Sequence, residues 1–143
     1  MAEGRTLPPE APASPTHVTV RREDYRPPEW LVPEISLDFD LDPDATRVRA
    51  TLKVVRNGDH GSPLRLDGDE IRPTAVPVDG TDAEWRMRKD QLVIAIAGNE
   101  ATVETEVLIH PAANTKLTGL YASGGILCTQ CEAEGFRRIT FFP

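Results

Sequence analysis

The sequence contains little cysteine and no long hydrophobic run. Only two of its 143 residues are cysteine, Cys128 and Cys131. The longest apolar stretch covers residues 92–97, whereas a helix that spans a membrane needs about 20 apolar residues. The first fifteen residues, MAEGRTLPPEAPASP, lack the apolar segment of a secretory signal. These absences predict a cytoplasmic protein with no membrane partner, in which the two cysteines are reduced thiols rather than a disulfide.

Positive charge is also scarce, since 16 Lys and Arg stand against 23 Asp and Glu, for a net charge of −7. Proteins that bind nucleic acid need a surplus of Lys and Arg to neutralise phosphates, so we expect no nucleic-acid partner. The negative charge permits a cationic partner without demonstrating one, because it also keeps a protein soluble. The length, with 39% hydrophobic and 27% charged residues, fits one ordinary soluble domain.

Helical periodicity is absent from every segment of ten or more residues, and alternation takes its place. Apolar residues occupy every second position in EISLDFDL (34–41) and TRVRATLKVV (46–55), and ATVETEVLIH (101–110) alternates again through Val103, Val107 and Ile109. A period of two is typical of a strand with one buried face. The DPDA sequence between the first two runs predicts a hairpin turn.

Shorter strands are predicted by PLRL (63–66), EWRMRK (84–89), QLVIAIA (91–97) and the final RRITFF (137–142). Pro73 and Pro77 restrict IRPTAVPV (71–78) to an edge or irregular piece. Strands at this spacing, with no helix between them, predict an all-β fold, an antiparallel saddle-like β-sandwich. We expect a single domain over residues 16–143, after a disordered tail (1–15) rich in Pro, Ala and Glu.

The segment before residue 34 gives weaker signals. THVTVRRED (16–24) could form a first short strand. YRPPEWLVP (25–33) is expected to be irregular because its three prolines remove hydrogen-bond donors. We expect Tyr25, Trp30 and Leu31 to hold this segment against the domain.

The spacing of Cys128 and Cys131 is that of half a zinc site, but four ligands are needed and no histidine pair completes it. The three histidines, His17, His60 and His110, are isolated from one another. A redox CxxC motif normally follows a strand and opens a helix, a context that is missing here. We therefore interpret the cysteines as partly buried thiols that pack, and predict no metal ligand, cofactor or catalytic residue in this chain.

Near its C-terminus the sequence reads NTKLTGLYASGGILCTQCEAEGFRRITFFP. This stretch closely resembles the bacterial branch of the aminopeptidase N family, zinc metallopeptidases that remove N-terminal residues from peptides. In that family a GLY.S segment leads into a TQ.E motif, followed by arginine and aromatic residues. DYRPPEWLVPEISLDFDLDPDATRV, PLRLDG and HPAANTKL also occur in the family's order, so the resemblance covers residues 24–143.

The resemblance implies a saddle-shaped N-terminal β domain that precedes a thermolysin-like catalytic domain. That catalytic domain carries H-E-x-x-H and G-[AG]-M-E-N motifs, and neither is present here. We therefore expect an incomplete N-terminal domain, a fragment of its parent, with zinc bound elsewhere in the parent enzyme. The chain alone is expected to have no peptidase activity.

The resemblance also implies roles for two residues of the TQ.E motif. Glu132 matches the glutamate that holds the α-ammonium of the substrate, and Gln130 matches the glutamine that lines the pocket for the first residue. On an extended segment these two side chains would share one side. No role is implied for Glu134. The expected partners are thus a peptide N-terminus and the missing catalytic domain.

Two further expectations follow. An uncovered sheet edge or the aromatic end ITFF (139–142) would favour self-association of the fragment. The alternative to a peptidase domain is a stand-alone β-sandwich interaction module without enzymatic activity. A reading frame that continues past Pro143 into an H-E-x-x-H motif would discriminate between them.

Overall fold

The computed structural model describes residues 19–143, which form eleven β-strands, three short 3-10 helices and no α-helix. The predicted all-β class is therefore confirmed. The predicted disordered tail (1–15) and His17 lie outside the described residues. Within the described residues, no helix is long and apolar enough to cross a membrane.

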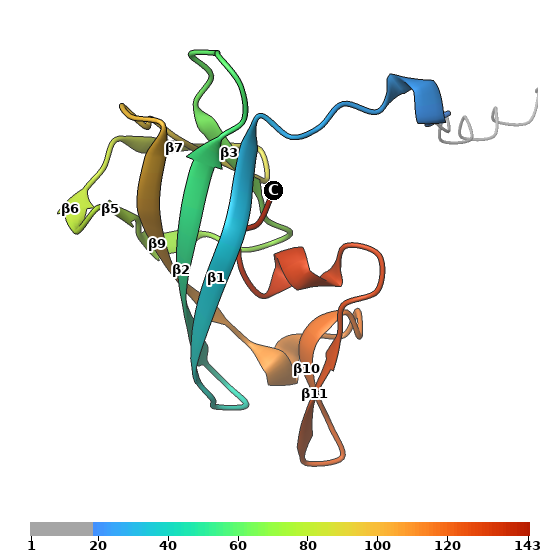
Figure 1. Cartoon of the computed structure of the whole chain (residues 1–143). Helices are drawn as coiled ribbons and strands as arrows, with labels where there is room; N and C mark the ends of the chain where they lie inside the picture. Colours follow the sequence, from blue (N-terminus) through green and yellow to red (C-terminus); the bar gives the residue numbers. More distant parts are fainter. Residues whose placement is uncertain (1–18) are drawn as a thin grey trace, which may run out of the picture.

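The main sheet has the strand order β1-β2-β9-β5-β6, and β4 pairs with another part of β9 (Figure 1). Its strands are β1 (Trp30–Asp40), β2 (Thr46–Arg56), β4 (Pro73–Ala75), β5 (Pro77–Val78), β6 (Thr81–Asp82) and β9 (Glu100–Ile109). Every pairing is antiparallel. The three alternating runs of the sequence thus form the three long strands β1, β2 and β9, as predicted. Pro73 and Pro77 fall in the short strands β4 and β5, which agrees with the irregular piece expected there.

A second sheet has the order β3-β8-β7, formed by β3 (Leu64–Asp67), β7 (Trp85–Arg88) and β8 (Gln91–Ile94). The buried faces of the two sheets share one hydrophobic core. Leu52 of β2, Leu66 of β3 and Ile94 of β8 are among its fully buried members. Burial of apolar surface between the two sheets is the main stabilising contribution in such a sandwich.

Strand β1 begins earlier than the sequence predicted, at Trp30 rather than at Glu34. Pro33 lies inside the strand, next to an irregularity in the register between Leu31 and Glu34. An edge strand tolerates this proline because one side of its backbone forms no ladder hydrogen bonds. The DPDA turn forms as predicted, with the backbone N–H groups of Asp44 and Ala45 donating to Asp42 Oδ1.

The segment before β1 differs from the prediction. Residues 22–24 form a 3-10 helix, η1 (Arg22–Asp24), where a strand had been predicted over 16–24, and residues 16–18 of that run lie outside the described part. Tyr25 is 70% exposed and Leu31 is also exposed, so of the three side chains expected to hold this segment only Trp30 is buried against the domain. The Trp30 indole N–H donates to the Ser62 carbonyl at 3.2 Å, which satisfies its polar atom within the core.

The prediction that RRITFF (137–142) forms a C-terminal strand is wrong. Its arginines belong to the 3-10 helix η3 (Gly135–Arg138), and only Phe142 forms an isolated bridge, to Asp67. Ile139, Thr140 and Phe141 are buried. The ITFF segment is therefore part of the core rather than an exposed aromatic surface, because the turn at η3 directs Phe141 under the sheet.

Candidate functional site at the end of strand β11

The C-terminal hairpin consists of β10 (Gly119–Ser123) and β11 (Ile126–Gln130) and stands apart from the two sheets (Figure 1). Its two-residue loop is Gly124-Gly125, with φ of 58° and 81°. Positive φ at both loop positions defines a type I′ turn, for which glycine is well suited. The register pairs Gly119 with Gln130, so the hairpin brings the end of β11 back to the start of β10.

Glu132 and Gln130 lie close together, but not for the reason the sequence suggested. Gln130 is the last residue of β11, whereas Glu132 lies in the turn that follows and not on an extended segment. The Glu132 backbone N–H donates to Gln130 Oε1 at 3.1 Å, so the glutamine side chain orders the turn. The Glu132 side chain is exposed, and within residues 19–143 its carboxylate has no hydrogen-bond or ion-pair partner.

Two glycines allow the turn at residues 131–134 to pack closely against the base of the hairpin. A Cβ atom on Gly135 would lie 2.7 Å from Thr118 Oγ1 and would also collide with the Gln130 carbonyl oxygen. A Cβ atom on Gly119 would lie 2.8 Å from the Arg138 Cβ, and Gly119 has a φ of 78°. These close approaches fix the position of residues 131–134 relative to the sheet.

The side chain of Arg138 ties η3 to the loop after β3. Arg138, whose side chain is only 10% exposed, binds Asp69 and Glu70, each at 3.1 Å. Lys116 pairs with the same Glu70, and hydrogen bonds from Lys116 and then from Arg138 hold the Glu70 pKa below its ordinary value of 4.5. No local pattern in the sequence indicated this cluster, because its members are far apart along the chain.

Arg137 gives Glu134 a structural role that the sequence did not predict. Arg137 binds Glu134 at 2.8 Å and Asp67 at 3.4 Å. Glu134 is thus directed toward its own helix η3, while Glu132, two residues earlier, is open to solvent. Glu132 of the TQ.E motif and Glu134, which lies just after the motif, therefore differ in their surroundings.

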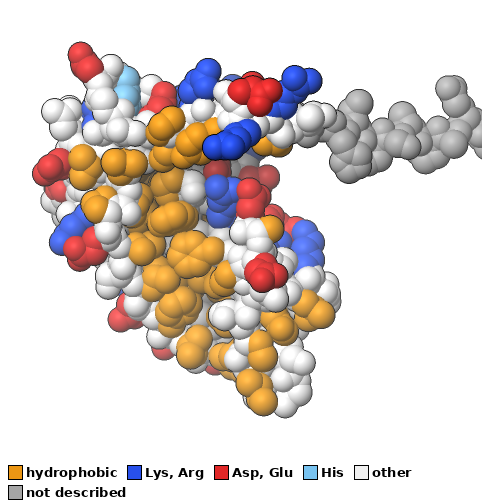
Figure 2. Space-filling model, turned by 45° about the vertical axis from the view of Figure 1, so that its right-hand side comes forward, with side chains coloured by type: hydrophobic (Ala, Val, Ile, Leu, Met, Phe, Trp, Pro, Cys, Tyr) orange, Lys and Arg blue, Asp and Glu red, His pale blue; other side chains and the backbone are white. Residues whose placement is uncertain are grey.

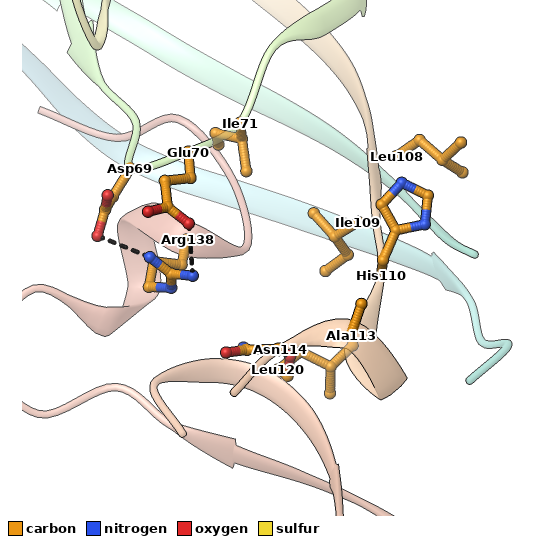
Figure 3. A pocket seen from close by; sticks show the side chains of 10 residues that line it. All are labelled: Asp69, Glu70, Ile71, Leu108, Ile109, His110, Ala113, Asn114, Leu120 and Arg138. Atoms are coloured by element: carbon orange, nitrogen blue, oxygen red, sulfur yellow. Dashed lines mark hydrogen bonds and ion pairs between the residues drawn. The ribbon is translucent and has the colours of Figure 1, made fainter. Parts of the chain in front are cut away.

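A hollow of about 190 Å³ lies beside the cluster of Arg138, Asp69 and Glu70 (Figure 3). Its polar side chains include Glu70, Arg138 and His110, and Ile109 and Leu120 contribute apolar surface. In Figure 3 Asp69 and Glu70 point toward Arg138, on the opposite side of the hollow from His110. Neither Gln130 nor Glu132 lines it, so the hollow and the end of β11 are separate features.

The cysteines differ from each other in exposure. Cys128, on β11, is half-buried, whereas Cys131 is exposed rather than packed as the sequence suggested, and both are free thiols. Among residues 19–143, no three His, Cys, Asp or Glu side chains gather as a metal site would require. His60 and His110 instead contact the carbonyl oxygens of Glu29 and Asp44, each at 2.7 Å.

No family model matches the chain. The chain is 44% identical over 131 residues to aminopeptidase N of Caulobacter vibrioides, and the aligned region covers 90% of this chain and 15% of that protein. It is also 44% identical over 122 residues to aminopeptidase N of Escherichia coli, covering 85% of this chain and 14% of that protein. The chain thus spans about 15% of the length of the relatives it matches.

Solved structures of aminopeptidases and metallopeptidases also resemble this chain. Aminopeptidase A of Legionella pneumophila, in complex with aspartic acid, superimposes with a TM-score of 0.76 at 30% identity, over 85% of this chain and 15% of that one. An M1 zinc metallopeptidase of Deinococcus radiodurans, an E323A mutant bound to a Tyr-Ser-Ala substrate, has a TM-score of 0.64 over 80% of this chain and 29% of that one. At 17% identity, this second likeness shows the fold alone.

The sandwich with its appended β10–β11 hairpin therefore has the fold of the N-terminal β domain of aminopeptidases. More particularly, the chain is homologous to the N-terminal region of aminopeptidase N, and the family resemblance stated from its sequence is confirmed.

Proposed function

We propose that this chain is the substrate-anchoring β domain of a zinc aminopeptidase, and that Glu132 binds the α-ammonium of the peptide with Gln130 beside it. The observation that supports this most directly is the exposed Glu132 carboxylate, without a partner in residues 19–143, in a turn ordered by Gln130. The 44% identity to aminopeptidase N adds to it.

The chemistry of the proposed contact is simple. An α-ammonium has three donors and a positive charge, and a carboxylate accepts from it through a charge-assisted hydrogen bond. Holding the amine fixes the distance from the substrate N-terminus to the first peptide bond, so a misplaced amine also misplaces the reacting carbonyl. Gln130 and Glu132 would thus position the substrate and not react with it.

Zinc, with its ligands, would belong to the rest of such an enzyme, where it supplies Lewis-acid chemistry for peptide hydrolysis. The face of this domain beside the turn would then dock against the catalytic domain. The anchoring of the turn by Gly135 and Arg138 supports a positioning role, because a carboxylate that selects an amine must be held in place.

The test is the Glu132→Gln substitution in the zinc aminopeptidase that we propose contains this chain. Glutamine keeps the shape and removes the charge, and a hydrogen bond to a charged group contributes roughly 1.5–3 kcal/mol. We expect kcat/KM on a short peptide to fall by about 10- to 150-fold, from that free energy. Steady-state kinetics beside the unsubstituted enzyme measures it.

Glu134→Gln is the matched control. Glu134 is paired with Arg137 at the surface, an interaction that contributes at most about 1 kcal/mol, so we expect a much smaller change in kcat/KM. If Glu132→Gln retained full kcat/KM, or if Glu134→Gln were the more damaged variant, the assignment of Glu132 would be wrong. The alternative, a stand-alone interaction module, would be favoured if the reading frame carried no H-E-x-x-H motif after this domain.

A further inference from the structure

The β10–β11 hairpin is not joined to the sandwich by backbone pairing. Among residues 19–143, its two strands pair only with each other. Its sequence, residues 119–130, contains no charged residue. In Figure 2 the visible side of the lowest part of the molecule, where Figure 1 places the hairpin, accordingly shows hydrophobic and uncharged side chains. Any ion pair that orients the hairpin must therefore come from the segments that flank it.

Apolar burial holds the base of the hairpin but does not fix its direction. Leu120, near the start of β10, is buried in the core that the two sheets share. The hydrophobic effect is non-directional, so this contact allows the hairpin to tilt about its base. Contacts with defined geometry are needed to hold the hairpin at one angle.

Both flanks of the hairpin carry a cation, and both cations contact the same carboxylate. Lys116 precedes β10, and Arg138 is the last residue of η3, which follows β11. Glu70 Oε1 accepts a hydrogen bond from Lys116 Nζ, and Glu70 Oε2 accepts one from Arg138 Nη2 at 3.1 Å. Figure 3 shows the Glu70 side chain directed toward Arg138. Since Glu70 belongs to the loop after β3, one side chain of the sandwich holds the segment 116–138 at both ends.

The backbone of Glu70 is in an unfavourable conformation. Its φ is 58°, in the left-handed region that residues other than glycine, asparagine and aspartate seldom adopt. Strain of this kind persists only where surrounding contacts determine the conformation, and it is often found at residues with a functional role. The two ion pairs of Glu70 are contacts that offset the strain.

Arg138 connects Glu70 to the end of β11. A Cβ atom on Gly119 would lie 2.8 Å from the Arg138 Cβ, so the two residues pack directly against each other. Gly119 is the register partner of Gln130, and Gln130 Oε1 accepts from the Glu132 backbone N–H. A shift of Arg138 would thus reach the proposed substrate-binding residues through a single backbone pair.

The exposures of the partners indicate an effect on orientation more than on folding. The Arg138 side chain is 10% exposed, whereas that of Glu70 is 55% exposed, and solvent screens ion pairs of exposed groups. Loss of the Glu70 charge would leave Arg138 with Asp69, at 3.1 Å, and would leave the apolar core intact. Lys116 would lose its partner altogether within residues 19–143.

We propose that Glu70 is a positioning residue, which fixes the orientation of the β10–β11 hairpin, and with it Gln130 and Glu132, relative to the sandwich. Its consequence for catalysis rests on the proposed function, because Glu70 would act on the substrate only through Glu132. The orientation of the hairpin is independent of that function.

The orientation is measured by NMR on the ¹⁵N-labelled, weakly aligned chain. Residual dipolar couplings of the β2 and β9 amides define the frame of the sandwich, and those of β10 and β11 report the hairpin. In Glu70→Gln we expect the sandwich couplings to fit the structure still and the hairpin couplings to fit it no longer. Lys116→Gln, which releases one flank only, should produce a smaller change of the same kind.

Glu34→Gln is the matched control. Glu34 is also an exposed glutamate in an ion pair, with Lys53 at 2.8 Å, but this pair lies on the main sheet. We expect Glu34→Gln to leave the hairpin couplings unchanged.

The second measurement uses the zinc aminopeptidase that we propose contains this chain. Glu70→Gln should lower kcat/KM on a short peptide by about 3- to 30-fold, more than the loss of a surface ion pair alone and less than gross misplacement of a reactant. In the Glu132→Gln background the same substitution should change kcat/KM by less than about twofold, because its effect acts through Glu132. A merely structural role would give the same loss in both backgrounds.

Three results would overturn the inference. Hairpin couplings that are unchanged in Glu70→Gln would show that other contacts, such as the hydrogen bond from the Asp69 N–H to the Arg137 carbonyl at 2.8 Å, hold the hairpin without Glu70. Altered couplings throughout the sandwich would show a general effect on the fold. Equal losses of kcat/KM with and without Glu132 would exclude action through that residue. If Glu132→Gln itself had no effect, the proposed function would fail, and the couplings alone would decide whether Glu70 positions the hairpin.

Discussion

At Gly68 the chain passes so close to Phe141 that a side chain has no room. A Cβ atom there would lie 2.7 Å from Phe141 Cδ1 and 2.8 Å from Ile71 Cγ1. Phe141 is completely buried and cannot move aside without disturbing the core. We expect Gly68→Ala to lower the free energy of unfolding by about 1–3 kcal/mol, the usual cost of overpacking, measured by urea denaturation.

Gly61 provides the control for this substitution. A Cβ atom at Gly61 would meet nothing within 4 Å, and its φ lies outside the left-handed region. We expect Gly61→Ala to leave stability unchanged or to raise it by up to about 1 kcal/mol, through the lower entropy of the unfolded chain. Equal losses in both variants would show that general backbone effects, and not contact with Phe141, determine the result.

Glu70 makes stability depend on pH. The hydrogen bonds from Lys116 and Arg138 lower the Glu70 pKa in the folded state below its ordinary value of 4.5. A carboxyl group whose pKa is lower in the folded state stabilises the protein when the pH is above the pKa of that group in the unfolded state. This stabilisation is lost as the pH falls through the folded-state pKa. We expect the Tm of Glu70→Gln to fall less steeply than that of the unsubstituted chain as the pH drops below about 4.5.

Thermal melts at a series of acidic pH values give the comparison. Glu104→Gln serves as the control, since the Glu104 side chain is exposed and has no ion-pair partner within residues 19–143. A slope for Glu70→Gln identical to that of the unsubstituted chain would mean that the cluster around Arg138 does not contribute.

At the scale of elements, the β10–β11 hairpin depends on its two-residue loop. Gly124 has a φ of 58°, a conformation that costs a β-branched residue about 1–2 kcal/mol but suits asparagine. We expect Gly124→Val to increase hydrogen exchange at the amides of Tyr121 and Cys128, whereas Gly124→Asn should not. Unchanged exchange in Gly124→Val would show that the hairpin is held by its base and not by its loop.

At the scale of the whole molecule, charge opposes self-association. The net charge is −7, and the solvent face of strand β1 is itself acidic. Salt screens such repulsion within a Debye length of about 8 Å at physiological ionic strength. If two copies meet through the apolar side of β1, we expect association to increase with salt, as measured by light scattering across a concentration series. Association that weakens with salt would contradict this.

Several features of this protein follow from the sequence by itself. A strand exposes alternate residues to opposite sides, so the period of two in residues 46–55 and 101–110 predicted β2 and β9 with their buried faces. Turn residues such as Asp42 act on their own neighbours, and so their effect is visible locally. The assignment of Gln130 and Glu132 as substrate-binding residues also rests on a continuous motif, TQ.E, and stays a prediction.

Other features were decided only by the tertiary structure, because they depend on which distant segments meet. Arg138 binds Glu70 across 68 positions of sequence, a pairing that no local pattern encodes. RRITFF has the composition of a strand, yet Phe141 packs into the core beside Gly68 instead of extending a sheet. Period two in residues 34–41 predicted strand β1, but whether its outer side is covered depends on the strand order of the whole sheet.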